Sequence, residues 1–177
     1  MFNFFNKKKN NTNKQTINDY VDGLFALEVA RCANEYSKYF FGLDGWKNKE
    51  INMYNIFFLT GFTAYAALFE NNKTQTEANI VSTEVTLNLL KDYEKQKHTP
   101  LTSEEINELK KMYGEFMNKF ILAYQNYLNK KDLGMFSQLI FHSVQEGGSQ
   151  ISDGFLTNEI NFMPLMFSLK NKLKEYV

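Results

Sequence analysis

The chain has 177 residues, the usual length of one domain, and 44% of them are hydrophobic, including 17 Phe and 10 Tyr. A domain of about this size buries roughly 70% of its unfolded surface, so the composition excludes a wholly disordered protein. Basic and acidic residues balance at 20 each, but four lysines and no acid lie in the first 16 residues. The remainder has 16 basic and 20 acidic residues, and this net charge of −4 disfavours nucleic-acid binding by the folded body.

Cysteine usage and the start of the chain both favour a cytoplasmic protein. Cys32 is the only cysteine, so an intrachain disulfide is excluded. The phenylalanines among the first five residues precede the lysines, and no apolar segment follows them, which is not the order of a secretory signal. We therefore expect a reducing cytoplasm as the location.

The first 16 residues are rich in Asn and Lys and hold too few apolar side chains to form a core. They predict a flexible basic tail at 1–16, followed by one all-helical domain at 17–177. An alternative role for the tail is a weak peripheral contact with the inner membrane surface, because apolar insertion adds to the attraction between lysines and anionic lipid. The residues that would make this contact are Phe2, Phe4, Phe5, Lys7, Lys8 and Lys9.

From Ile17 onward, apolar residues recur at steps of three and four, which predicts a first helix from 17 to about 40. The GLDG stretch from Gly42 to Gly45 supplies the turn that ends it. The apolar stripe of this helix consists of Val21, Phe25, Val29, Cys32, Tyr36 and Phe40.

The segment 51–69 contains no charged residue and is apolar on nearly every side. This pattern is typical of a helix surrounded by other helices or of a membrane span. Several Asn and Thr side chains interrupt the apolar run, which favours a core helix. Gly61, Ala64 and Ala67 recur at spacing three and form a smooth strip that a neighbouring helix can approach closely.

Two capping boxes, Thr74 with Glu77 and Thr102 with Glu105, mark the starts of two further helices. The first of these helices begins near 75 and ends before Pro100, which cannot continue a regular helix. The second has a long apolar stripe that predicts an amphipathic helix facing the core. This stripe comprises Ile106, Leu109, Tyr113, Phe116, Phe120, Tyr124 and Leu128.

A shorter helix is predicted around Phe136 to Val144, where apolar residues again recur at helical spacing. Gly147-Gly148 ends it, and 147–154 is predicted to be a loop. Pro164 suits the first position of a last helix. These segments predict an all-α fold, a single-domain helical bundle of five or six helices with no sheet, because only other helices can cover each apolar stripe.

The sharpest polar cluster is formed by Glu28, Arg31 and Glu35, which stand at i, i+3 and i+7 on the first helix. One guanidinium can therefore engage a carboxylate on each adjacent turn. The favoured interpretation is a structural salt-bridge network at the rim of the core. The functional interpretation is a ligand-binding site in which Arg31 binds a carboxylate or phosphate.

No residue pattern predicts catalysis, a metal or a cofactor. Di-iron bundles use Glu-x-x-His pairs, and the chain has none. Its two histidines stand four residues from Glu94 and Glu146, as in ordinary helix pairs. Ser149 lies in a glycine loop that matches no nucleophile or phosphate motif, and Cys32 lies in an apolar stripe. We therefore predict no catalytic residue, no metal site and no cofactor.

The sequence favours a non-enzymatic helical protein–protein interaction module, of the adaptor, regulatory or inhibitor type. Its partner would be another protein or a second copy, because apolar helical surface is abundant while a set of nucleophile, base and charge stabiliser is missing from the sequence. The alternative is a bundle that binds a small apolar or anionic ligand in an aromatic-lined pocket, with Arg31 as its polar anchor. An exposed apolar surface would favour the first hypothesis, and an enclosed pocket containing Arg31 or Glu28 would favour the second.

Overall fold

The computed structural model describes residues 16–42, 52–130, 136–137, 139–140, 144 and 155–177. In this part of the chain the regular structure is helical and no strand occurs, which confirms the predicted all-α bundle. The helices are α1 (Ile17–Val21), α2 (Leu24–Gly42), α3 (Met53–Glu70), α4 (Gln75–Gln96), α5 (Ser103–Lys130) and α7 (Phe155–Lys174).

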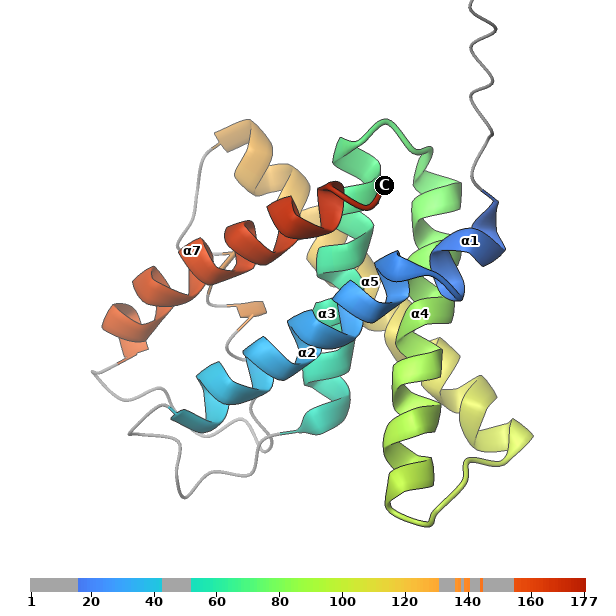
Figure 1. Cartoon of the computed structure of the whole chain (residues 1–177). Coiled ribbons are helices and arrows are strands. Elements are labelled where there is room, and N and C mark those ends of the chain that lie inside the picture. The colour runs from blue at the N-terminus through green and yellow to red at the C-terminus, as the bar shows by residue number, and fades with distance from the viewer. Residues whose placement is uncertain (1–15, 43–51, 131–135, 138, 141–143, 145–154) are drawn as a thin grey trace, which may run out of the picture.

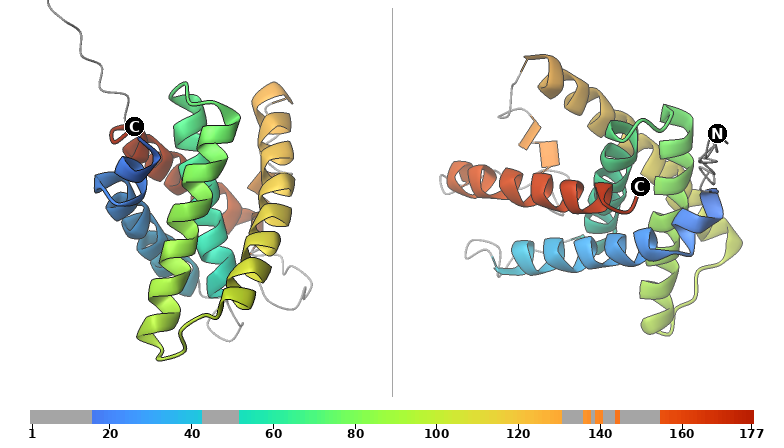
Figure 2. Two further views of the ribbon diagram at one scale, coloured as in Figure 1. Left: turned by 90° about the vertical axis from the view of Figure 1, so that its right-hand side faces the viewer. Right: turned by 45° about the horizontal axis from the view of Figure 1, so that its top comes forward.

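The helices form two layers, which Figures 1 and 2 show from three directions. In one layer, α3, α4 and α5 run alongside one another, with α3 in the middle. In the other, α2 and α7 lie side by side and cross the first layer over α3. A single hydrophobic cluster takes side chains from all of these helices, so the core lies between the layers and around α3.

Helix α3 is the centre of the bundle. Every residue from Ile56 to Leu68 is buried, which matches the sequence pattern of a helix that is apolar on nearly every side. The prediction of a core helix is thus confirmed for this segment. Among the described helices, none combines the length and the apolarity that a membrane crossing requires.

Gly61 allows the helices on either side of α3 to come close. A Cβ atom at this position would lie 2.0 Å from Oγ1 of Thr86 on α4 and 2.5 Å from the hydroxyl oxygen of Tyr113 on α5. Burial raises the pKa of Tyr113 to about 12, although the hydroxyls of Ser82 and Thr86 act in the opposite direction. The smooth strip predicted at Gly61 is therefore a real point of close approach.

Both predicted capping boxes are present. The Thr74 N–H donates to Oε2 of Glu77 (3.0 Å), and the Glu77 N–H donates to Oγ1 of Thr74 (3.2 Å). Thr102 and Glu105 make the same reciprocal pair at 2.7 and 3.3 Å. These bonds satisfy amides that the first turn of a helix leaves without a partner, and they fix the starts of α4 and α5.

The predicted first helix is in fact two helices, α1 and α2. The Asp22 N–H donates to the Asn18 carbonyl (2.9 Å) and ends α1. At Gly23 a Cβ atom would lie 2.2 Å from the backbone oxygen of Asp19, so the junction accepts only glycine without a backbone shift. Thr16, which the sequence boundary assigned to the tail, caps α1 through a further capping box with Asp19.

The start of the last helix was also predicted wrongly. Helix α7 begins at Phe155, so Pro164 lies inside it and not at its first position. Proline removes one helix hydrogen bond, and the ring of Pro164 is exposed.

The predicted helix around 136–144 is described only in part. Phe136, Ile140 and Val144 are helical and buried, and Leu139 is half-buried. The Asn52 N–H donates to the Val144 carbonyl (3.2 Å), which ties this segment to the start of α3. The predicted loop at 147–154 lies outside the described residues.

We expect Gly61→Ala to lower the free energy of unfolding by about 1 to 3 kcal/mol, because the added methyl group overpacks the contact with Thr86 and Tyr113. Gly114→Ala is the matched control. A Cβ atom there meets nothing within 4 Å on the exposed side of α5, so this change should stabilise the protein by about 0.5 to 1 kcal/mol. Urea unfolding of both variants measures the difference, and equal effects would contradict the close approach.

Candidate interaction groove

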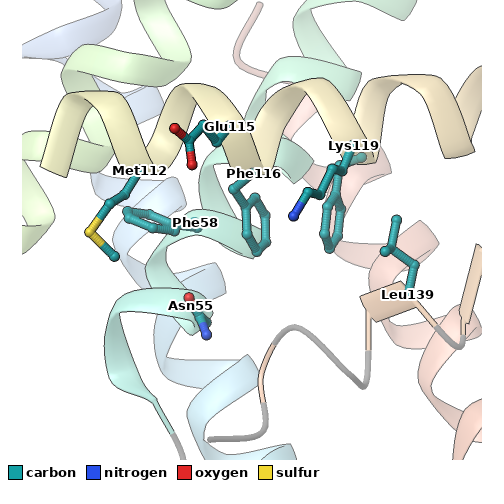
Figure 3. A pocket seen from close by; sticks show the side chains of 8 residues that line it. Asn55, Phe58, Met112, Glu115, Phe116, Lys119 and Leu139 are labelled. Atoms are coloured by element: carbon teal, nitrogen blue, oxygen red, sulfur yellow. The ribbon is translucent and has the colours of Figure 1, made fainter. Parts of the chain in front are cut away.

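One candidate site is a hollow between the middle of α5 and the first half of α3, with a volume of about 390 Å³. Figure 3 shows the rings of Phe58 and Phe116 within it, while Glu115 and Lys119 extend from α5 at its rim. Its lining residues are Asn55, Phe58, Met112, Glu115, Phe116, Lys119, Phe120 and Leu139.

Aromatic rings form the floor of this hollow. Phe116 is stacked on Phe120, with ring centroids 4.1 Å apart, and its ring lies 5.4 Å from that of Phe58. Phe120 is buried in the bundle, as its place in the apolar stripe of α5 predicts, but Phe116 is only half-buried. Met112 is 42% exposed at the edge of the rings. This surface offers apolar contact area that the described neighbours leave open.

A second hollow of about 270 Å³ continues toward the start of α5 and shares Met112 with the first. Its lining residues are Tyr54, Leu101, Glu105, Glu108, Leu109 and Met112. The two hollows follow one face of α5 from Glu105 to Phe120, which is about 22 Å at 1.5 Å per residue. We call this continuous surface the α5 groove.

A buried carboxylate fixes the wall of the groove near Tyr54. The Tyr54 hydroxyl donates to Oε1 of Glu94 (2.7 Å), and the Thr99 hydroxyl donates to Oε2 of Glu94 (2.7 Å). These two bonds lower the pKa of Glu94 despite its burial, and burial raises the pKa of Tyr54 to about 12. Lys97 also pairs with Glu94, at 3.8 Å. The wall is therefore held in place before any partner binds.

The turn after α4 supports the same wall. His98 adopts a left-handed backbone with φ of 62°, and the Thr99 N–H donates to the Glu94 carbonyl (3.0 Å). This geometry is a Schellman cap, in which the αL residue is most often glycine. The exposed His98 therefore has a structural role in ending α4.

A second polar cluster lies at the opposite end of α3. Lys170 of α7 donates to Oε1 of Glu70 (2.6 Å) and to the Tyr124 hydroxyl (3.1 Å), and Tyr124 also donates to Glu70. Lys174 contacts the other Glu70 oxygen at 3.3 Å. Burial raises the pKa of Glu70, but the bonds from Lys170, Tyr124 and Lys174 outweigh it and lower the pKa overall. This cluster joins α3, α5 and α7, and neither hollow of the groove includes it.

The Arg31 cluster is only partly as predicted. Arg31 pairs with Glu28 at 2.9 Å, but Glu35 pairs with Lys38 at 2.8 Å. The Arg31 side chain is 64% exposed on the outer face of α2, and none of Glu28, Arg31 and Glu35 lines the α5 groove. The geometry gives two separate ion pairs and no shared network through Arg31.

Other candidate residues do not assemble into a site. Cys32 is buried, and burial raises its pKa to about 12, so its thiol stays protonated at neutral pH. In the described part of the chain, no three His, Cys, Asp or Glu side chains are grouped so as to hold a metal ion. The proposed membrane-contact residues 2–9 lie outside the described residues, as do Glu146 and Ser149.

The apolar stripe of α5 does not predict the groove. Phe116 and Phe120 belong to the same stripe, and their spacing places both in the bundle centre. One sequence pattern does indicate an apolar surface with an acidic border. Along the first half of α5, acidic residues alternate with apolar ones: Glu105, Glu108 and Glu115 flank Leu109 and Met112. Comparison with protein-family models, with curated proteins and with solved structures finds no match for this chain.

Arg31→Lys should change the free energy of unfolding of dilute protein by less than about 1 kcal/mol, because exposed ion pairs contribute little. Urea unfolding measures this directly. A loss above about 2 kcal/mol would mean that the planar guanidinium does more than pair with Glu28.

Glu70→Gln should lower the free energy of unfolding at pH 7 by about 1 to 3 kcal/mol, because Lys170 is left buried without its counter-charge. The folded pKa of Glu70 lies below its ordinary value of 4.5, so the stabilisation is complete above that value and is lost as the pH falls through the folded pKa. The gap between wild type and variant should therefore shrink as the pH falls below about 4.5. The exposed Glu175→Gln is the control, and a gap that stays constant with pH would contradict this role.

Proposed function

We propose that this protein is a non-enzymatic interaction module whose α5 groove binds an apolar segment of a protein partner. The observation that carries the proposal is the pair of joined hollows with an aromatic floor, bordered by the exposed Met112. A helix that lies in an apolar groove buries its own apolar face there and keeps its backbone hydrogen bonds. The buried thiol of Cys32 is compatible with action in a reducing compartment such as the cytoplasm.

The shape of the site favours a segment over a small molecule. Small-molecule pockets enclose most of the surface of their ligand, whereas the α5 groove is open along about 22 Å. The same geometry argues against catalysis, because its charged side chains stand at the rim, at Glu105, Glu108, Glu115 and Lys119. Among the described lining residues, no nucleophile stands beside a base.

A small apolar or anionic ligand is the second candidate, and one observation favours it. The hollow at Phe116 has a volume of about 390 Å³, which is within the range of ligand pockets. Its cation is Lys119, so an anionic ligand would pair with Lys119 and not with Arg31.

Selection of peptides from a displayed library against the full chain tests the proposal. We expect the selected peptides to carry apolar residues at steps of three and four and to lose at least tenfold in affinity, about 1.4 kcal/mol, for Met112→Glu. Leu122→Glu is the matched control, because Leu122 is 61% exposed on α5 outside the groove. Fluorescence polarisation measures both affinities.

Peptides that bind wild type and Met112→Glu equally well would contradict the groove as the binding surface. Two results together would support the ligand carrier instead. Repeated selections would enrich no peptide, and a small apolar probe would bind wild type but not Phe116→Ala.

A further inference from the structure

The outer face of α2 carries an exposed stripe that the bundle does not cover. Its members are Leu24, Leu27, Arg31, Asn34, Lys38 and Phe41. They stand at steps of three and four, so they share one side of the helix. The two leucines and the phenylalanine are 69%, 51% and 54% exposed, and the Arg31 and Lys38 side chains are 64% and 63% exposed. This α2 stripe is therefore apolar at its ends. Between them its outermost charges are Arg31 and Lys38, which also pair with Glu28 and Glu35 of the same helix.

The α5 groove has the complementary composition. Its aromatic floor at Phe116 offers a place for apolar side chains, and three of the four charged residues among its described lining are acidic. One of these, Glu105, has its pKa lowered by hydrogen bonds from Thr102, which keeps it ionised at neutral pH. Opposite charges on the two surfaces favour their approach and set their register.

The two surfaces also agree in length. Residues 24–41 of α2 span about 26 Å, and residues 105–120 of α5 span about 22 Å. A helix is the appropriate occupant, because it satisfies its own backbone hydrogen bonds, while an added strand needs a sheet edge, and the described residues contain none.

Charge decides the direction in which α2 would lie. In the antiparallel direction, Leu24 and Leu27 reach the aromatic floor, Arg31 lies near Glu115, and Lys38 lies near Glu108. The parallel direction would place the leucines over the acidic end and Lys38 beside Lys119, which costs free energy through like charges.

We propose that the α2 stripe of a second copy of this chain binds the α5 groove in the antiparallel direction. This inference rests on the proposed function and names the partner of the same groove. The contact joins two different surfaces, so each copy offers one groove and one stripe, and association continues head to tail. It also gives the only arginine of the chain a role between copies, beyond its pair with Glu28.

Sedimentation velocity of the full chain over rising protein concentration tests the inference. Wild type should show an increasing weight-average sedimentation coefficient. Leu27→Glu removes the stripe, Met112→Glu removes the groove, and each should stay monomeric at every concentration. The control Leu122→Glu should associate like wild type. Wild type that remains a monomer up to about 1 mM would overturn the inference.

A mixture of Leu27→Glu and Met112→Glu makes the sharper test. The first variant keeps an intact groove and the second an intact stripe, so the mixture should form a 1:1 dimer and nothing larger. A mixture that stays monomeric while wild type associates would show a symmetric or different interface and overturn the proposal.

Charge exchange tests the register. Arg31→Glu should weaken association, and the double variant Arg31→Glu with Glu115→Arg should restore it. The double variant Arg31→Glu with Asp92→Lys has the same net charge, but Asp92 lies outside the groove, so it should restore nothing. Equal recovery in both double variants would overturn the stated register.

The self-association and the proposed function can fail separately. If wild type does not self-associate but peptides still bind its groove, the proposed function stands and only this inference is refuted.

Discussion

The structure depends on the close packing of other helices around α3. This helix has no charged residue before Glu70, and its buried residues leave it no solvent-facing side between Ile56 and Leu68. Such a helix is stable in water only where neighbours cover all of its faces. Gly61 permits that arrangement, because the space of its missing side chain is taken by Thr86 and Tyr113. The positions of α4 and α5, and hence of the groove between α3 and α5, follow from this contact.

Hydrogen-bonded carboxylates lie at the two ends of α3, where they join α3 to the surrounding helices. At the start, Tyr54 donates to Glu94, and at the end, Glu70 accepts from Tyr124 and Lys170. Each carboxylate is buried or half-buried but has several donors, which lowers its pKa in spite of desolvation. A carboxylate bonded in this way specifies which helices meet, because a shifted register would leave a buried charge without a partner.

Local signals in the sequence predicted much of the fold. The capping boxes at Thr74 and Thr102 act within one helical turn, so spacing alone reveals them. The break at Gly23 was missed because the apolar stripe keeps its period across it. The start of α7 was misplaced because proline is most common in the first turn of a helix, whereas Pro164 lies well inside α7. The groove and the partners of Glu70 depend on residues far apart in the chain, and periodicity carries no information about which helices become neighbours.

The groove originates at the edge of the apolar stripe of α5. Leu109, Tyr113 and Phe120 face the core and are buried. Met112 and Phe116 lie at the edge of this stripe, where Met112 is 42% exposed and Phe116 is half-buried. Burial of such a surface by another helix would yield free energy that the monomer leaves unused, at about 25 cal/mol for each Å² of apolar area removed from water. The acidic residues along the same edge interrupt this apolar surface and have the charge opposite to Arg31 and Lys38 of the proposed partner helix.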